Sequence, residues 1–196
     1  EEFWNKYADE NESRYNEEFA KYLRDLASSL PGVQSILEIG CGTGIDLRLF
    51  SDSFQLHGID LNEHALEIAK EKLSFADFQK ENITKLPFED SSIDFVFTHG
   101  LMNYLDDDVL EKGIAEMFRV SKRWIMHCEK YEKIEKRIDV NHKFRNMGEK
   151  WLDYKIKFFF YHHEWLTLLL SFLYKGEHFY SLILKKNDHV YQYNPS

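Results

Sequence analysis

The sequence predicts an α/β fold with a doubly wound, mainly parallel sheet of seven strands, helices on both faces and an antiparallel last strand. Short apolar runs alternate along the chain with segments of helical periodicity, as parallel strands joined by crossover helices require. The first apolar run is followed by a loop with glycine at every second position, and the second apolar run ends in a single acidic residue. Together these observations favour a sheet whose loops meet at one edge.

Seven short apolar runs are the predicted strands, at residues 35–39, 54–59, 75–80, 93–98, 124–127, 156–162 and 178–184. The run 93–98 is interrupted only by Asp94, which is typical of a buried parallel strand. The run 178–184 alternates between apolar and polar residues, which suits an antiparallel pair. Residues 129–150 show no clear period, so a loop and a short helix are expected there.

Four helices are expected between these strands. Apolar residues recur at helical spacing from Phe19 to Leu26, and Pro31-Gly32 ends that helix. A second helix over 43–51 follows the glycine loop, and a fourth begins at the acids Asp106–Asp108, which suit the positive end of its dipole. Asn62 caps the third helix. Its predicted buried stripe is Leu61, Ala65, Ile68, Ala69 and Leu73.

The most informative motif is Ile-Leu-Glu-Ile-Gly-Cys-Gly-Thr-Gly at residues 36–44. Glycine lets the backbone turn tightly and approach a ligand. The second strand ends at Asp60, whose carboxylate is suited to accept hydrogen bonds from a cis-diol. Ile45 stands where a dinucleotide-binding loop has its third glycine, and the lysine of a P-loop is absent. Alternatively, the glycines form a plain turn and Asp60 caps a helix.

These residues resemble the first motif of class I S-adenosylmethionine-dependent methyltransferases (types 11 and 25), in which an acid precedes G-x-G-x-G. Residues 82–97 add to the resemblance, because a polar residue, a Leu-Pro-Phe turn and a fourth strand follow in the family's order. The resemblance implies a Rossmann-like fold and S-adenosyl-L-methionine as the cofactor. Asn82 stands where the family usually has an Asp that contacts the adenine amino group. The implied cofactor-binding residues are Glu38, Gly40, Cys41, Gly42, Asp60, Leu61, Asn82, Ile83, Thr98 and Tyr15.

We expect one domain over 1–196, with an N-terminal helical lid segment (1–31), a cofactor-binding core (33–127) and a substrate-side segment with the closing strands (128–196). In many relatives the leading segment folds over the cofactor. Tyr7 and Tyr15 are therefore candidates there, Tyr15 for the methionine carboxylate. Plain packing of an aromatic helix is the alternative.

His99 is the candidate catalytic residue. Ligands of α/β sheets bind beyond the carboxyl ends of the strands, so the loop 98–104 should border the reactive methyl group. An imidazole there suits a general base or a substrate contact. Alternatively, only the backbone of His99 lines the cofactor.

The expected reaction is methyl transfer to an O or N atom of a small molecule. The net charge of −9 argues against generic nucleic-acid binding, although residues 119–145 carry nine Lys and Arg against four Asp and Glu. That local excess favours an anionic substrate, with His142, Arg145 and Tyr131 as candidate contacts. Two alternatives stay open: an RNA or protein methyltransferase that docks through this segment, and a catalytically silent domain that binds the cofactor or a partner protein.

Other site and location classes receive little support. The neighbouring imidazoles of His162-His163-Glu164 would point to opposite faces of a strand, so no metal is expected. No apolar run reaches the ~20 residues of a membrane span, and two cysteines indicate no disulfide framework. We therefore expect a cytoplasmic protein, a monomer or homodimer, without membrane contact. Its general layout resembles small methylases of bacterial surface-sugar biosynthesis.

Overall fold

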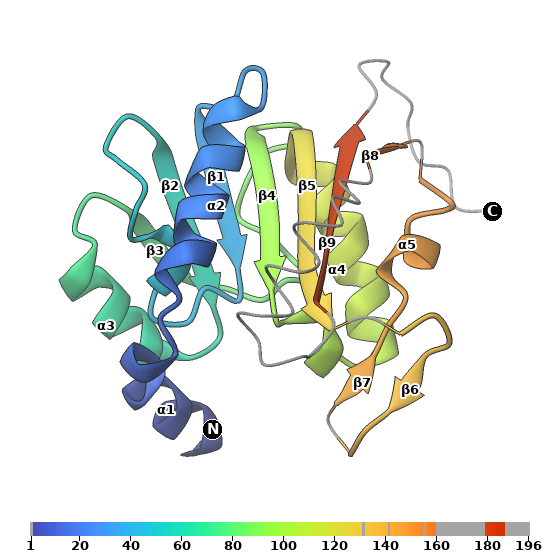
Figure 1. Ribbon diagram of the computed structural model, residues 1–196, viewed down its shortest axis with the longest axis horizontal. Helices are drawn as coiled ribbons and strands as arrows, with labels where there is room; N and C mark the ends of the chain where they lie inside the picture. The colour runs from blue at the N-terminus through green and yellow to red at the C-terminus, as the bar shows by residue number, and fades with distance from the viewer. Residues whose placement is uncertain (1, 131, 141, 155, 160–178, 187–196) are drawn as a thin grey trace.

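The computed structural model of the protein describes residues 2–130, 132–140, 142–154, 156–159 and 179–186. One sheet runs in the order β3-β2-β1-β4-β5-β9-β8, with helices in front of it and behind it (Figure 1). Its strands are β1 (Ser35–Ile39), β2 (Gln55–Asp60), β3 (Asp77–Lys80), β4 (Ile93–His99), β5 (Ser121–Lys130), β8 (Ile156–Phe159) and β9 (Phe179–Lys186). A separate two-stranded hairpin is formed by β6 (Lys136–Arg137) and β7 (Lys143–Phe144).

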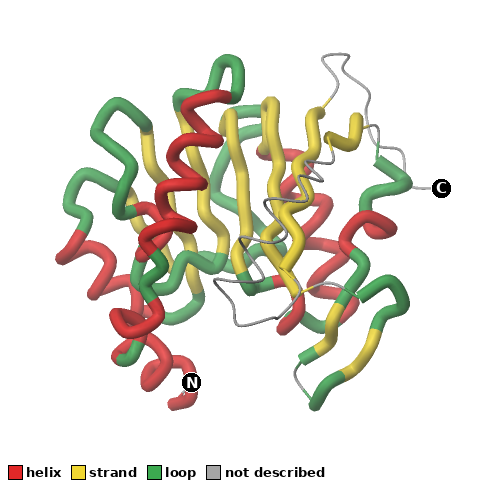
Figure 2. The backbone as a smooth tube through the Cα atoms, viewed as in Figure 1, coloured by secondary structure: helices red, strands yellow, loops and turns green. Residues whose placement is uncertain are grey.

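The helical elements of the described residues range from the three-residue turn η2 to the 14-residue helix α4. The α-helices are α1 (Glu2–Asp9), α2 (Glu17–Ser29), α3 (Glu63–Lys72), α4 (Asp107–Val120) and α5 (Met147–Lys150). Three 3₁₀ turns join them: η1 (Asn11–Arg14), η2 (Ile45–Leu47) and η3 (Met102–Tyr104). Figure 2 shows how these red segments alternate with the yellow strands along the chain.

The strands β3, β2, β1, β4 and β5 are parallel neighbours. Strand β9 pairs antiparallel with β5 on one side and with β8 on the other. The predicted α/β, Rossmann-like fold with a parallel central sheet is therefore confirmed, and the parallel part has five strands. The carboxyl ends of these five strands share one edge, to which the N-terminal helix α1 and the β6–β7 hairpin also come (Figure 1).

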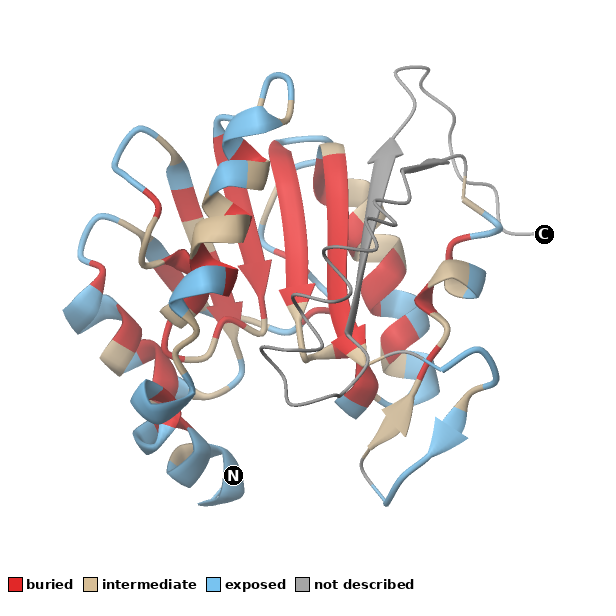
Figure 3. Ribbon diagram, in the orientation of Figure 1, coloured by how far each residue is buried: buried red, intermediate tan, exposed pale blue. Residues whose placement is uncertain are grey.

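Two apolar layers cover the faces of the sheet. Because side chains alternate along a strand, Ile36 lies in one layer and Leu37 in the other. The first layer contains Phe19 and Leu23 of α2 with Leu66 of α3. The second contains the inner face of α4, namely Leu110, Ile114 and Met117. Figure 3 shows the result: β1, β4 and β5 are buried over most of their length.

The predicted helix over 43–51 is wrong. Gly44 has a left-handed φ of 69°, and the following backbone makes i→i−3 hydrogen bonds, Leu47 N to Gly44 O and Phe50 N to Leu47 O. Bonds of that spacing belong to a 3₁₀ turn, so only η2 forms. The turn buries Asp46 and Leu47 instead of exposing a helix surface.

Other element boundaries follow the sequence more closely. Strand β1 begins and ends where predicted, and the Asn62 side chain accepts a hydrogen bond from Ala65 N as the predicted cap of α3. The buried stripe of that helix is wrong at Leu61, which is 62% exposed, and Leu66 is buried instead. Strand β5 extends beyond 124–127 at both ends, because β4 pairs with its start and β9 with its end.

Some predictions fall outside the described residues: those on Tyr131 and on His162-His163-Glu164. Within the described ranges, no helix combines the length and apolar character that a membrane crossing requires.

Candidate functional site

The glycine loop between β1 and η2 lies at the carboxyl edge of the sheet. Gly40 N and Cys41 N both donate to the carbonyl oxygen of Ile59, at 2.8 and 3.0 Å, so the loop is fastened to the end of β2. Gly42 has a φ of 51°, which disfavours other residues. A Cβ atom built there would meet only the Asn11 Nδ2 atom, at 3.8 Å. The backbone of the loop is thus left accessible at Gly42.

Asp60, the last residue of β2, faces this loop. Its Oδ2 atom accepts a hydrogen bond from Gly42 N and its Oδ1 atom accepts one from Asn62 N, both at 2.8 Å. A carboxylate has about four acceptor positions, so each oxygen keeps one for a ligand. Asp60 does not cap a helix, because Asn62 is the N-cap of α3. The exposed Leu61 lies directly beside it in the chain.

Two other predicted contacts, Asn82 and Ile83, lie on the loop that follows β3. The Asn82 Oδ1 atom accepts hydrogen bonds from Thr84 N and Thr84 Oγ1, at 2.9 and 3.0 Å. The contact of Asn82 with the adenine amino group, which the resemblance implies, stays a prediction. Ile83 is buried and packs where a Cβ on Gly113 of α4 would be.

His99, at the end of β4, is brought to the glycine loop by Asp46 of η2. The His99 Nδ1 atom lies 2.7 Å from Asp46 Oδ2, and the Phe19 ring covers the imidazole at 4.2 Å between centroids. Burial alone would lower the pKa of His99, but the Asp46 carboxylate and, more weakly, Glu129 raise it above its ordinary value. Asp46 is a site residue that sequence reasoning missed, because the expected helix over 43–51 gave it no inward direction.

Glu38 of β1 lies behind Asp46 and is 2% exposed. Burial, followed by the nearby Asp46 and Asp60 carboxylates, raises the pKa of Glu38 well above its usual range. Glu38 is within hydrogen-bonding reach of Asp46. Glu38, the acid of the first motif, thus packs behind Asp46 in the protein interior.

A directed chain of hydrogen bonds runs beside His99 through β4 and β5. Trp151 Nε1–H donates to His127 Nε2 at 3.0 Å, so the proton of this neutral imidazole is on Nδ1. His127 Nδ1 lies 2.8 Å from Thr98 Oγ1, which donates to Glu129 Oε1 at 3.0 Å. Burial lowers the pKa of His127 to about 3 and raises that of Glu129. Thr98 is thus tied to the protein interior, and Glu129 is a second residue that the sequence analysis missed.

The N-terminal segment is fastened over the same loop. Asn11 Nδ2 donates to Thr43 Oγ1 at 2.8 Å, and Glu12 forms ion pairs with Arg48 and Lys72. Arg48 and then Lys72 lower the pKa of Glu12 to about 2. The Tyr15 ring carries the Arg48 guanidinium at 5.0 Å. The segment predicted as a lid therefore contacts the glycine loop through Asn11, and Glu12 ties it to Arg48 next to η2 and to Lys72 of α3.

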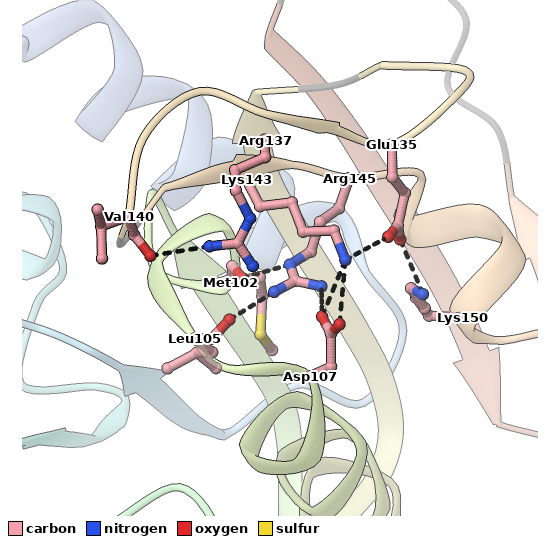
Figure 4. A network of polar contacts seen from close by, with 9 residues as sticks. All are labelled: Met102, Leu105, Asp107, Glu135, Arg137, Val140, Lys143, Arg145 and Lys150. Carbon is pink, nitrogen blue, oxygen red and sulfur yellow. Dashed lines mark hydrogen bonds and ion pairs between the residues drawn. The ribbon is translucent and has the colours of Figure 1, made fainter.

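The basic segment 119–145 is largely neutralised within the fold. Its side chains that pair with carboxylates are Arg119, Lys122, Arg123, Lys143 and Arg145. Arg145 is 1% exposed and donates to Asp107 Oδ1 at 2.6 Å and to the carbonyl oxygens of Met102 and Leu105 (Figure 4). The predicted contact of Arg145 with an anionic substrate is wrong, because its guanidinium joins β7 to η3. His142 stacks on Tyr104 at 4.5 Å.

No metal centre is found in the part of the chain that the structure describes, since it holds no group of three His, Cys, Asp or Glu side chains with metal-binding geometry. Cys41 and Cys128 are both buried and both free thiols.

Comparison with known proteins agrees with this geometry. Residues 36–123 match the family model described as a methyltransferase domain. A demethylmenaquinone methyltransferase of Renibacterium salmoninarum is 32% identical over 100 residues, covering 50% of this chain and 40% of that protein. Phosphoethanolamine N-methyltransferase 2 of Caenorhabditis elegans is 31% identical over 113 residues, covering 54% and 25%. The matches thus span less than half the length of these curated relatives.

A solved structure extends the likeness beyond the matched segment. Phosphoethanolamine N-methyltransferase 1 of Haemonchus contortus, in complex with phosphoethanolamine and S-adenosylhomocysteine, has a TM-score of 0.69 at 20% identity, covering 99% of this chain and 49% of that one. At that identity the likeness concerns the fold. Over residues 36–123, the chain resembles the class I S-adenosylmethionine-dependent methyltransferases in sequence and in fold.

Proposed function

We propose that the protein transfers a methyl group from S-adenosylmethionine to an O or N atom of a small molecule. One observation carries the proposal: the Gly42 amide, the Asp60 carboxylate and the His99 imidazole are brought to one edge of the sheet by hydrogen bonds between their own loops. Binding of the methyl donor and activation of the methyl acceptor use groups from different strands, which meet at the carboxyl edge of a parallel sheet.

The residues present fit the cofactor. The exposed backbone at Gly42 offers a surface for its methionine part, since a Cβ there would meet only Asn11. The remaining acceptor positions of Asp60 suit the two ribose hydroxyls, and the exposed Leu61 suits an apolar face of the adenine. Bound there, the cofactor would supply an electrophilic methyl group. The other proposed contacts are Glu38, Gly40, Cys41, Asn82, Ile83, Thr98 and Tyr15.

Space for an acceptor lies next to His99. Gly100 has a φ of 64°, and a Cβ built on it would meet no heavy atom of the described residues within 4 Å. His99, one residue earlier, supplies the group that would take the proton of an O–H or N–H acceptor. The position proposed for the methyl acceptor therefore combines open space at Gly100 with the titratable ring of His99.

A small acceptor is favoured over RNA or protein. The relatives' names specify demethylmenaquinone and phosphoethanolamine methyltransferases, which act on small molecules. The basic segment that RNA would use is paired with carboxylates from Glu116, Asp90, Asp94 and Asp107.

The proposal also includes the division of the chain into three parts, with boundaries at residues 31 and 128, and a cytoplasmic location. The two free thiols agree with a reducing compartment.

The test is methyl transfer from S-adenosylmethionine labelled on its methyl group. The protein is incubated in turn with a small-molecule extract, total RNA and total protein, and label is counted in each. We expect label in the small-molecule fraction, and much less of it when Asp60→Ala replaces the wild type at a limiting concentration of the labelled cofactor. Label in RNA or protein would establish the docking alternative. S-adenosylhomocysteine binding without labelling of any fraction would establish the catalytically silent domain.

A further inference from the structure

Asp46 occupies a position between the glycine loop and the acceptor side. Its side chain is 8% exposed and that of His99 is 17% exposed, so neither charge is well solvated. A carboxylate only accepts hydrogen bonds, so the 2.7 Å contact requires that His99 Nδ1 carries a proton. In the neutral imidazole, the proton acceptor is then Nε2.

Two further contacts hold this arrangement in place. The Phe19 ring lies against the imidazole at 4.2 Å and restricts its rotation. Asp46 itself belongs to η2, whose backbone is fixed by the bond from Leu47 N to the Gly44 carbonyl oxygen, at 3.1 Å. An imidazole oriented by a buried carboxylate is the arrangement by which a general base is activated.

We propose that Asp46 is a positioning residue that fixes the tautomer and the charge of His99, so that Nε2 faces the methyl acceptor as the proton-accepting atom. The inference rests on the proposed function and deepens it. In the reaction, the acceptor's O–H or N–H bond breaks and its proton passes to Nε2. The acceptor's electron pair forms the bond to the methyl carbon, and the carbon–sulfur bond breaks with its electron pair left on sulfur. His99 then returns the proton to water.

The charges around His99 agree with this role. Among the described residues, Asp46 from η2 and Glu129 from β5 are carboxylates that act on His99, and both favour the imidazolium that the reaction forms. Glu38 stands behind Asp46 on β1, and burial, followed by the Asp46 and Asp60 carboxylates, raises its pKa well above the usual range.

The experiment is ¹⁵N NMR of the imidazole rings in protein without cofactor, with the His99 signals assigned through His99→Ala. In the wild type we expect neutral His99 to carry its proton on Nδ1 and to titrate above 6.5. In Asp46→Asn the pKa should fall by about 1 to 3 units, the usual effect of removing a close opposite charge. Asp77→Asn is the matched control. It removes a carboxylate from His57 on the β2–β3 edge, where the two atoms are 3.5 Å apart, and must leave the His99 signals unchanged.

A proton on Nε2 of wild-type His99, or a pKa that Asp46→Asn leaves unchanged, would overturn the inference. The wild-type tautomer decides the question even if Asp46→Asn does not fold. Calorimetric titration with S-adenosylhomocysteine separates this outcome from failure of the proposed function. Absence of binding would contradict the methyltransferase proposal, whereas the His99 tautomer would still report on Asp46.

Discussion

Asp60 and Gly42 are joined by a 2.8 Å hydrogen bond from the Gly42 amide to the Asp60 Oδ2 atom. The acid that ends the second strand therefore does two things: it fixes the glycine loop and presents acceptor positions beside it. Both follow from the parallel pairing of β1 and β2, which aligns Ile39 with Ile59 and so brings the two loops together.

The first prediction concerns this carboxylate. Asp60→Ala should weaken S-adenosylhomocysteine binding by about 1.5–3 kcal/mol, or roughly 10- to 150-fold, because charged hydrogen bonds to the ribose are lost. Isothermal titration calorimetry measures the change. Asp77→Ala, in the adjacent exposed strand β3, is the control and should bind as the wild type does. Equal affinities for the two variants would show that Asp60 does not bind the cofactor.

The second prediction concerns the buried guanidinium of Arg145. Arg145→Met should lower the free energy of unfolding by about 1–3 kcal/mol, because the carbonyl oxygens of Met102 and Leu105 lose their donor. Urea denaturation measures it. Arg137→Met, which removes an exposed arginine of the same hairpin that donates to Val140 O, should change stability by less than about 0.5 kcal/mol. Similar denaturation midpoints for the two variants would contradict a stabilising role of Arg145.

The third prediction is a pH dependence that arises from His127. Burial lowers the pKa of this histidine from 6.5 to about 3, so the unfolded chain takes up a proton that the folded chain does not. This contribution to stability is complete above pH 6.5 and is lost as the pH falls toward 3, by about 1.4 kcal/mol per pH unit.

His127→Gln should therefore flatten the pH dependence of the unfolding free energy between about pH 6 and 4.5, relative to the wild type. His64→Gln, at an exposed ring, controls for the loss of a histidine as such. Parallel curves for wild type and His127→Gln would mean that the pKa of His127 is the same in the folded and the unfolded protein.

Local sequence signals predicted much of the fold. The run 35–39 forms a strand with the predicted ends, because its apolar pattern and the flanking Gly40 are local signals. The Asn62 cap is likewise contained in four residues. The helix over 43–51 failed because its apolar spacing competes with a left-handed Gly44 and with a buried partner for Asp46. That partner, His99, is 53 residues away in the sequence.

The candidate site was predictable to the same degree. Gly42 and Asp60 stood out by residue type and spacing, and the structure joins them. Asp46 and Glu129 gave no signal, since their roles depend on contacts with β4 that no local pattern encodes. Arg145 was wrongly predicted as a substrate contact for the same reason, because its acceptors lie on η3 and α4.

The most direct measurement is calorimetric titration of the wild-type protein with S-adenosylhomocysteine, with NAD⁺ titrated in parallel. The G-x-G-x-G loop with Ile45 at the next position, together with Asp60, predicts saturable one-to-one binding of S-adenosylhomocysteine and no binding of NAD⁺. Absence of S-adenosylhomocysteine binding, or equal binding of both ligands, would contradict the assignment of this edge of the sheet as an S-adenosylmethionine site.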